Sequence, residues 1–320
     1  MAYSAGDTIL DDEYNTFVNS ASSPYGYNHF AGTGSAEYGL GQSAISTVAA
    51  GNTVQASQWN SLFTGLANIS NHTNVALTST TAVSAGDTIA VKAALISDIA
   101  SMATQVSTGC PNATALSTSA ALTTVTTGSE GWNTSATQEV SATFSNANEM
   151  RWFFNAGGKL RLVVTATAAS VSAKDTAFVA LGTGIGNLDV GAHATTRSNA
   201  GQALTTDGLA NGFYDLTTSY TTLIKLTQNS YAAYNSNTLE IQAKLDAAAG
   251  SATVLTFKMI ATDPADDTQY TSGNVSGIAV DINDTPKMVS KIYSINPTTA
   301  EGLDPVYIPA STAQVSNTTT

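Results

Sequence analysis

Strict alternation of polar and apolar residues recurs through the second half of the chain and constrains its fold more than any other feature. The alternating stretches are residues 139–144, 220–226, 239–245 and 254–260. A period of two turns one face of a strand toward a core and the other toward water, which is typical of antiparallel sheets. The chain is therefore expected to be mainly β, with an antiparallel β-sandwich or jelly-roll-like C-terminal domain over residues 136–295.

A hairpin is expected near the start of that domain. Residues 151–154 would form its first strand, 155–158 a Gly-rich turn and 159–165 the return strand. The aromatic residues expected in the sheet core or at an interface are Trp152, Phe153 and Phe154. The last strand of the domain is expected at residues 277–282.

A short phrase occurs three times in the first hundred residues, at 4–9, 49–54 and 84–89. Each copy joins a chain-reversing Gly to Asp or Asn and then Thr, which are residues that cap helix N-termini. Apolar residues spaced by three and four follow each copy, as on one face of a helix. Chance use of a common turn is the alternative. The helices that the phrase predicts span residues 1–20, 49–71 and 84–106.

These patterns divide the chain into four parts. Residues 1–106 form an α-helical N-terminal region, 107–135 a Thr/Ser-rich linker, 136–295 the β domain and 296–320 an extended tail. We expect the tail to be disordered in an isolated monomer or exchanged onto a neighbouring subunit.

Composition narrows the classes of function. Charged residues make up 11% of the chain, against about 25% in average soluble proteins. The hydroxyl and amide residues that replace them are common in virion proteins, bacterial surface layers and adhesins. The formal charge is −12 with only 11 Lys and Arg, so no basic stripe for nucleic acid is expected. No apolar run is long enough to span a membrane and no secretory signal is recognisable, so we expect synthesis in the cytoplasm.

The sequence contains no residue pattern that indicates catalysis or cofactor binding. The three histidines, His29, His72 and His193, are too far apart to share a helix face as zinc ligands and are expected to be structural. The single cysteine, Cys110, forms no internal disulfide. Residues 182–186 imitate a dinucleotide loop with the wrong spacing and without a following helix. We therefore expect no enzyme activity and no cofactor.

Two weaker ligand features remain. The acidic residues Asp263, Asp266 and Asp267 are calcium candidates, because loop carboxylates suit that ion. Their spacing matches no standard calcium loop, so a solvated turn is the alternative. Tyr231 and Tyr234 could stack on sugars, with packing inside the protein as the alternative.

Several phrases resemble those of structural proteins of tailed bacteriophages, especially marine and cyanobacterial phages. The phrases are residues 150–161, residues 212–220 with the following strand that carries Lys244, and the N-terminal blocks 4–9 and 38–42. The resemblance extends over most of the chain. It implies a non-enzymatic virion component, tail-associated or part of a fibre or appendage, made in the host cytoplasm and carried on the particle.

On this interpretation the protein acts by assembly with other virion proteins and with copies of itself, a trimer being favoured. Neither nucleic acid nor membrane is an expected partner. A head decoration or neck protein, and a carbohydrate-binding adhesin that recognises a host-surface glycan, are the alternatives. The helix-face residues expected to dock to other proteins are Tyr14, Phe17, Trp59, Leu62 and Phe63.

Overall fold

The computed structural model describes residues 11–78, 81–87, 92–111, 116–127, 132, 134–167, 173–229, 234–264 and 287–320. The chain forms two compact units, and each is built from separate stretches of sequence. Unit 1 comprises Met1–Ser117, Asn148–Gly158 and Asn296–Ile308, and unit 2 comprises Thr118–Ala147, Lys159–Ile295 and Pro309–Thr320. The division therefore differs from the four consecutive parts expected from the sequence.

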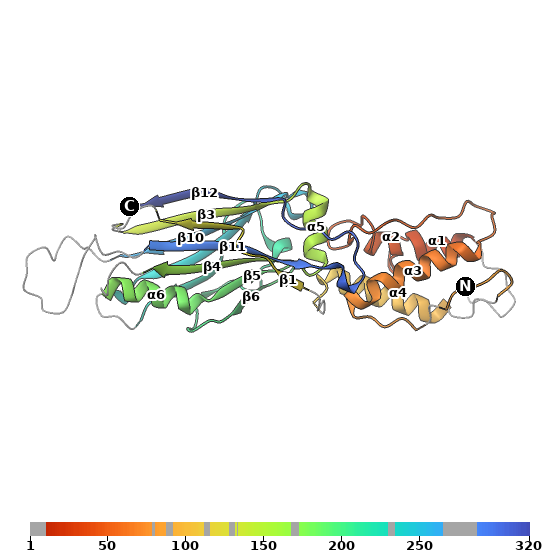
Figure 1. Ribbon diagram of the computed structural model, residues 1–320, viewed down its shortest axis with the longest axis horizontal. Coiled ribbons are helices and arrows are strands. Elements are labelled where there is room, and N and C mark those ends of the chain that lie inside the picture. The colour runs from red at the N-terminus through yellow and green to blue at the C-terminus, as the bar shows by residue number, and fades with distance from the viewer. Residues whose placement is uncertain are drawn as a thin grey trace, which may run out of the picture. The chain divides into compact units, whose positions relative to one another are not determined.

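Unit 1 is a helical unit with one apolar core. Its helices are α1 (Asp11–Asn19), α2 (Tyr27–Phe30), α3 (Ala56–Thr73), α4 (Lys92–Ser107) and most of α5 (Ala147–Asn155), with the short turn η6 (Thr299–Glu301) (Figure 1). The buried face of α3 includes Trp59, Leu62, Leu66 and Ile69, which recur at spacings of three and four. Leu303 joins the same core from the C-terminal stretch.

The second copy of the repeated phrase forms a tight turn and not a helix cap, and residues 84–87 of the third copy form a turn as well, while its residues 88 and 89 lie outside the described residues. Gly51 and Gly86 have φ angles of 81° and 91°, where a side chain would be strained. In the third copy the Asp87 N–H donates to the Ser84 carbonyl at 3.1 Å, which closes the turn. Helix α3 begins only at Ala56, where the Gln58 side chain accepts the Gln55 N–H at 2.7 Å. The first copy lies outside the described residues.

The prediction of a hairpin at residues 151–165 is wrong for its first strand. Residues 151–154 belong to helix α5, and strand β4 (Lys159–Thr167) follows it. Met150, Phe153 and Phe154 are buried at helical spacing, so the aromatic run covers one side of a helix. Gly157, with a φ of 84°, ends the helix in the left-handed conformation, which explains the Gly-Gly pair.

Arg151 connects α5 to the loop after α2. Its side chain is 3% exposed. Nη1 donates to the carbonyls of Ala36 at 2.9 Å and Tyr38 at 3.0 Å, while Nη2 donates to the Thr33 carbonyl at 3.1 Å and to Asn148 Oδ1 at 2.8 Å. The planar guanidinium thus satisfies four acceptors on two segments that are more than one hundred residues apart.

Unit 2 consists mostly of antiparallel β-structure in two six-stranded sheets, an arrangement compatible with a β-sandwich. The strands of the first sheet run in the order β1-β11-β4-β5-β6, with β2 also paired to β11, and those of the second in the order β12-β3-β10-β9-β8-β7 (Figure 1). The further strands of the first sheet are β1 (Leu116–Thr118), β2 (Thr123–Thr126), β5 (Asn187–Val190), β6 (Thr195–Ser198) and β11 (Lys287–Pro297). Those of the second are β3 (Ser135–Thr143), β7 (Thr206–Asp207), β8 (Thr221–Thr227), β9 (Thr238–Leu245), β10 (Val254–Thr262) and β12 (Ser311–Thr319).

The alternating stretches are confirmed as strands β3, β8, β9 and β10. In β9 every second residue, from Leu239 to Leu245, is buried. A polar connection joins the two sheets inside the core, where Gln138 of β3 donates to the Met288 carbonyl of β11 at 2.9 Å. The strand expected at residues 277–282 lies outside the described residues.

The expected linker and tail contain strands. Within 107–135, β2 pairs with β11 and Trp132 is 1% exposed. The tail 296–320 first contributes to unit 1 and then forms β12, which pairs with β3. The Thr/Ser-rich composition of the expected linker indicates a flexible connection, but Thr is β-branched and also favours strands.

Helix α6 (Ala173–Ile185) packs against β4 of one sheet and against β8 and β9 of the other. Gly182 and Gly184, expected in a loop among strands, lie in this helix. A Cβ on Gly182 would lie 3.1 Å from the Val164 carbonyl oxygen, and one on Gly184 would lie 2.6 Å from Leu226 Cδ2. These glycines therefore permit the close approach of helix and sheets.

Replacing Arg151 with Lys is expected to lower the free energy of unfolding by roughly 2 to 4 kcal/mol, because one ammonium cannot reach all four acceptors. The measurement is urea unfolding followed by circular dichroism. Arg161→Lys is the matched control: Arg161 makes a bidentate pair with Asp189 at 2.6 and 2.8 Å and is 22% exposed, so its replacement, which leaves one charged partner in place, is expected to cost less, about 1 to 2 kcal/mol. Equal effects of the two substitutions would contradict the role given to Arg151.

Candidate functional site

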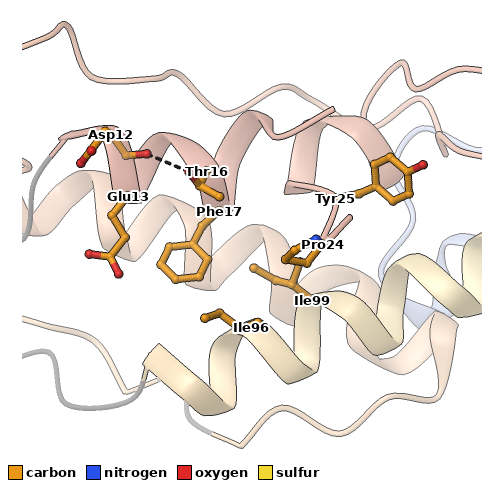
Figure 2. Close-up of a pocket in the computed structure, with 8 residues that line it drawn as sticks. All are labelled: Asp12, Glu13, Thr16, Phe17, Pro24, Tyr25, Ile96 and Ile99. Carbon is orange, nitrogen blue, oxygen red and sulfur yellow. Dashed lines mark hydrogen bonds between the residues drawn. The ribbon is translucent and has the colours of Figure 1, made fainter. Parts of the chain in front are cut away.

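A groove of about 300 Å³ lies in unit 1. It lies between α1, the segment that precedes α2, and α4 (Figure 2). Its lining residues are Asp12, Glu13, Thr16, Phe17, Pro24, Tyr25, Ile96 and Ile99.

The groove has an apolar floor beside an acidic patch. Phe17 and Ile99 are 5% and 2% exposed and form the floor, while Ile96 is 42% exposed at its side (Figure 2). Asp12 and Glu13 lie in the first turn of α1, where carboxylates interact favourably with the helix dipole. The lining combines a place for apolar groups with negative charge, and it contains no His, Cys or Lys that could act as a base or nucleophile.

Aromatic rings continue the surface next to the groove. Tyr25 stacks on His29, with the ring centroids 4.2 Å apart, and Tyr38 contacts both at 4.4 and 5.0 Å. All three side chains are half-buried. Burial lowers the pKa of His29 below its ordinary value, so the ring is held in its neutral form, which stacks without a desolvation cost for charge.

The residues expected to dock to other proteins lie inside unit 1 instead. Their exposed fractions are 0% for Tyr14, 5% for Phe17, 1% for Trp59, 0% for Leu62 and 9% for Phe63. The Trp59 ring is the centre of this cluster, with centroid distances of 5.3 Å to Tyr14, 5.9 Å to Phe17 and 5.8 Å to Phe63. The helix-face pattern was recognised correctly, but the face packs on its own chain, so these side chains are core residues.

The aromatic residues of α5 also have structural surroundings. Phe153 and Phe154 are fully buried. Trp152 donates from Nε1 to the Thr33 carbonyl at 2.9 Å, and its ring lies 4.8 Å from that of Tyr307. The three aromatic residues of α5 therefore pack within unit 1 and do not lie in a sheet.

The calcium candidates are not supported as a site. Asp263 is fully buried, and its Oδ2 lies 2.8 Å from Lys174 Nζ, so an ammonium already occupies the place a cation would need. Asp266 and Asp267 lie outside the described residues. Among the residues that the structure does describe, no group of three or more His, Cys, Asp or Glu is arranged to hold a metal ion.

The remaining sequence features have structural surroundings as well. His72 is fully buried and donates from Nε2 to the Ala156 carbonyl at 2.9 Å, and burial lowers its pKa. His193 stacks on Tyr214. Tyr234 is 1% exposed and so cannot stack on a sugar, while Tyr231 is outside the described residues. None of the helices in the described ranges is both long and apolar enough to cross a membrane.

Two buried cations escaped the sequence reasoning. Arg151 and Lys174 are 3% and 0% exposed. Each stands in an otherwise ordinary stretch, and no local pattern marks a charged residue as buried, because its partners come from distant segments. The low charge content was the one signal in the sequence, because a charged residue is rare in such a chain and is therefore more often there for a specific contact.

No known protein family, curated protein or solved structure matches this chain.

Truncating Phe17 tests whether the aromatic cluster is core. Phe17→Ala is expected to cost roughly 3 to 5 kcal/mol of unfolding free energy, because it leaves a cavity. Ile96→Ala, in the same groove but 42% exposed, is the matched control and should cost less than about 1 kcal/mol. Thermal unfolding compares the two, and an unchanged melting temperature for Phe17→Ala would restore the docking interpretation.

Proposed function

We propose that this chain is a non-enzymatic structural component of a bacteriophage virion, a tail-associated or fibre/appendage protein that acts by assembly. The phrase resemblance and the composition, with 11% charged residues, support a virion role. The proposal includes a jelly-roll-like arrangement of the strands in unit 2 and a docking role for the helical N-terminal region. A head decoration or neck protein is the alternative position on the particle.

The observation that carries an assembly role is the edge strand β12. It lies beside β3 at the edge of its sheet (Figure 1). It is nine residues long, it pairs through its backbone with β3 alone among the described strands, and most of its side chains are exposed. It contains neither a charged residue nor Pro. Soluble monomers usually protect a long edge strand with charge, Pro or a covering segment, because its free N–H and C=O groups can pair with another chain.

The other edge strands described in unit 2 are shorter than β12, and β1 and β2, with three and four residues, also carry no charge. β7 has only two residues and carries Asp207, and β6 has four residues and carries Arg197. In β12 the one irregularity is a bulge between Gln314 and Ser316, which leaves Val315 outside the regular register and 54% exposed. A strand without charge or Pro that carries an exposed apolar side chain is suited to contact a second protein.

A homo-oligomer is the simplest assembly that β12 supports, and a trimer is the expected size. Copies related by symmetry can bury the same strand in each subunit. Side-chain bonds from β12 to β2, between Thr123 and Thr312 at 2.6 Å and from Asn317 to the Thr126 carbonyl at 2.8 Å, hold the strand in place before it meets a partner. A partner would thus bind a preformed edge with little ordering cost.

Light scattering after gel filtration tests the proposal on the full chain. The expected result is a trimer or another closed oligomer. Val315→Lys is expected to convert it to monomer without lowering the melting temperature, because the residue is exposed and a charge on an edge opposes pairing. Leu122→Lys is the matched control, as Leu122 is a comparably exposed apolar residue (40%) outside β12. A wild-type monomer at all concentrations, or equal effects of both variants, would contradict the role of β12.

A further inference from the structure

One ion pair in unit 2 differs from the others in the described residues. Lys174 Nζ lies 2.8 Å from Asp263 Oδ2, and both side chains are 0% exposed. The Lys225–Glu240 and Lys258–Glu139 pairs span 3.5 and 3.8 Å, and all four of those side chains are partly exposed. Arg161 and Asp189 are as close, at 2.6 Å, but also partly exposed, so complete burial distinguishes Lys174 and Asp263 from the other described pairs.

The surroundings hold the two groups in place. Lys174 stands in the first turn of α6, and its Nζ lies 5.1 Å from the centre of the Trp132 ring. That ring makes an edge contact with Phe178 at 4.9 Å. Asp263 follows β10 directly, and its N–H donates to the Thr134 carbonyl at 2.8 Å. The backbone on both sides of the pair is thus anchored, and aromatic rings form part of the wall.

Such a site favours neutral groups over charged ones. Taking an ammonium and a carboxylate out of water is costly, and their attraction often fails to repay it. Transfer of one proton from Lys174 to Asp263 gives an amine and a carboxylic acid, which is the pair that can react. Fixed proximity raises the effective concentration of such a pair to the order of 10⁵ M or more.

We propose that Lys174 and Asp263 condense to an intramolecular isopeptide bond. After the proton transfer, the Nζ lone pair attacks the carboxyl carbon Cγ of Asp263. A C–N bond forms, the C–O bond to the hydroxyl breaks, and a second proton moves from nitrogen to that oxygen. Ammonium and carboxylate together yield one amide and one water, so no oxidant, cofactor or other reactant is needed.

The buried position favours the amide product. The leaving water escapes from an apolar site, and the neutral amide is easier to bury than two charges. Asp175, the next residue on α6, is 1% exposed and is a second carboxyl in the interior. The bond would join the start of α6 to the end of β10 and would resist unfolding as a disulfide does, but without dependence on a redox compartment.

Mass spectrometry of the full wild-type chain tests the proposal under denaturing conditions. The expected mass is lower than the sequence mass by one water. After trypsin, residues 162–197 should remain uncleaved at Lys174 and be covalently joined to residues 259–287. Peptides that contain Lys225 and Glu240 are the internal control and should remain unlinked.

The outcome is decided by the wild-type peptide map, whatever a variant does to folding. Cleavage at Lys174 and a free 259–287 peptide would overturn the proposal. Lys174→Arg should return the chain to the full mass of its own sequence, because a guanidinium keeps the charge but does not condense. A missing water that persists in Lys174→Arg would show that dehydration occurs at another residue and would also overturn it.

Discussion

The buried guanidinium of Arg151 is the interaction on which the architecture of unit 1 depends. Three of its four hydrogen bonds join helix α5 to the loop at residues 33–38, and the fourth, to Asn148, stays within the helix. The Thr33 carbonyl also accepts from Trp152 Nε1 at 2.9 Å and the Ala36 carbonyl from Asn155 Nδ2 at 3.4 Å, so several donors of α5 bind the same loop. Asn155 adds a bond to the Gly39 carbonyl at 2.9 Å, and His72 contacts the Ala156 carbonyl. The N-terminal helices are therefore complete only when a segment from the middle of the chain packs on them.

This requirement explains why the units are not consecutive domains. The connections from β3 to β4 and from β11 to β12 each contribute a stretch to unit 1 and then return to unit 2. The second stretch bonds to Gln42 of the N-terminal part of unit 1. The Asp304 N–H donates to Gln42 Oε1, Gln42 Nε2 donates to the Pro305 carbonyl, and Leu303 lies in the apolar core. A chain so interleaved gains non-local contacts in both units together, which favours cooperative folding over independent domains.

The sequence predicted the features that depend on local periodicity, and it failed where distant packing decides. The alternating strands β3, β8, β9 and β10 and the glycine turn at Gly51 were recognised from neighbouring residues alone. The aromatic run of α5 was assigned to a strand because Gly157 and Gly158 suggested a hairpin, although Met150, Phe153 and Phe154 already had helical spacing. Strand β12 has no alternating pattern, because most of its side chains face water. The partners of Arg151 and Lys174 could not be predicted, since a contact between distant residues leaves no mark on a single sequence.

The placement of charged and neutral polar residues links the structure to the proposed role. Charged residues make up 11% of the chain, Arg151 bonds to backbone carbonyls and Lys174 pairs with Asp263, while β12 is an edge strand without a charged residue. The measurement that tests the central claim most directly is quantitative mass spectrometry of density-purified virus particles from the source of the sequence. The account predicts that peptides of this chain co-purify with the particles in a fixed ratio to other structural proteins. Their absence from intact particles, with the chain present only in the soluble fraction, would contradict it.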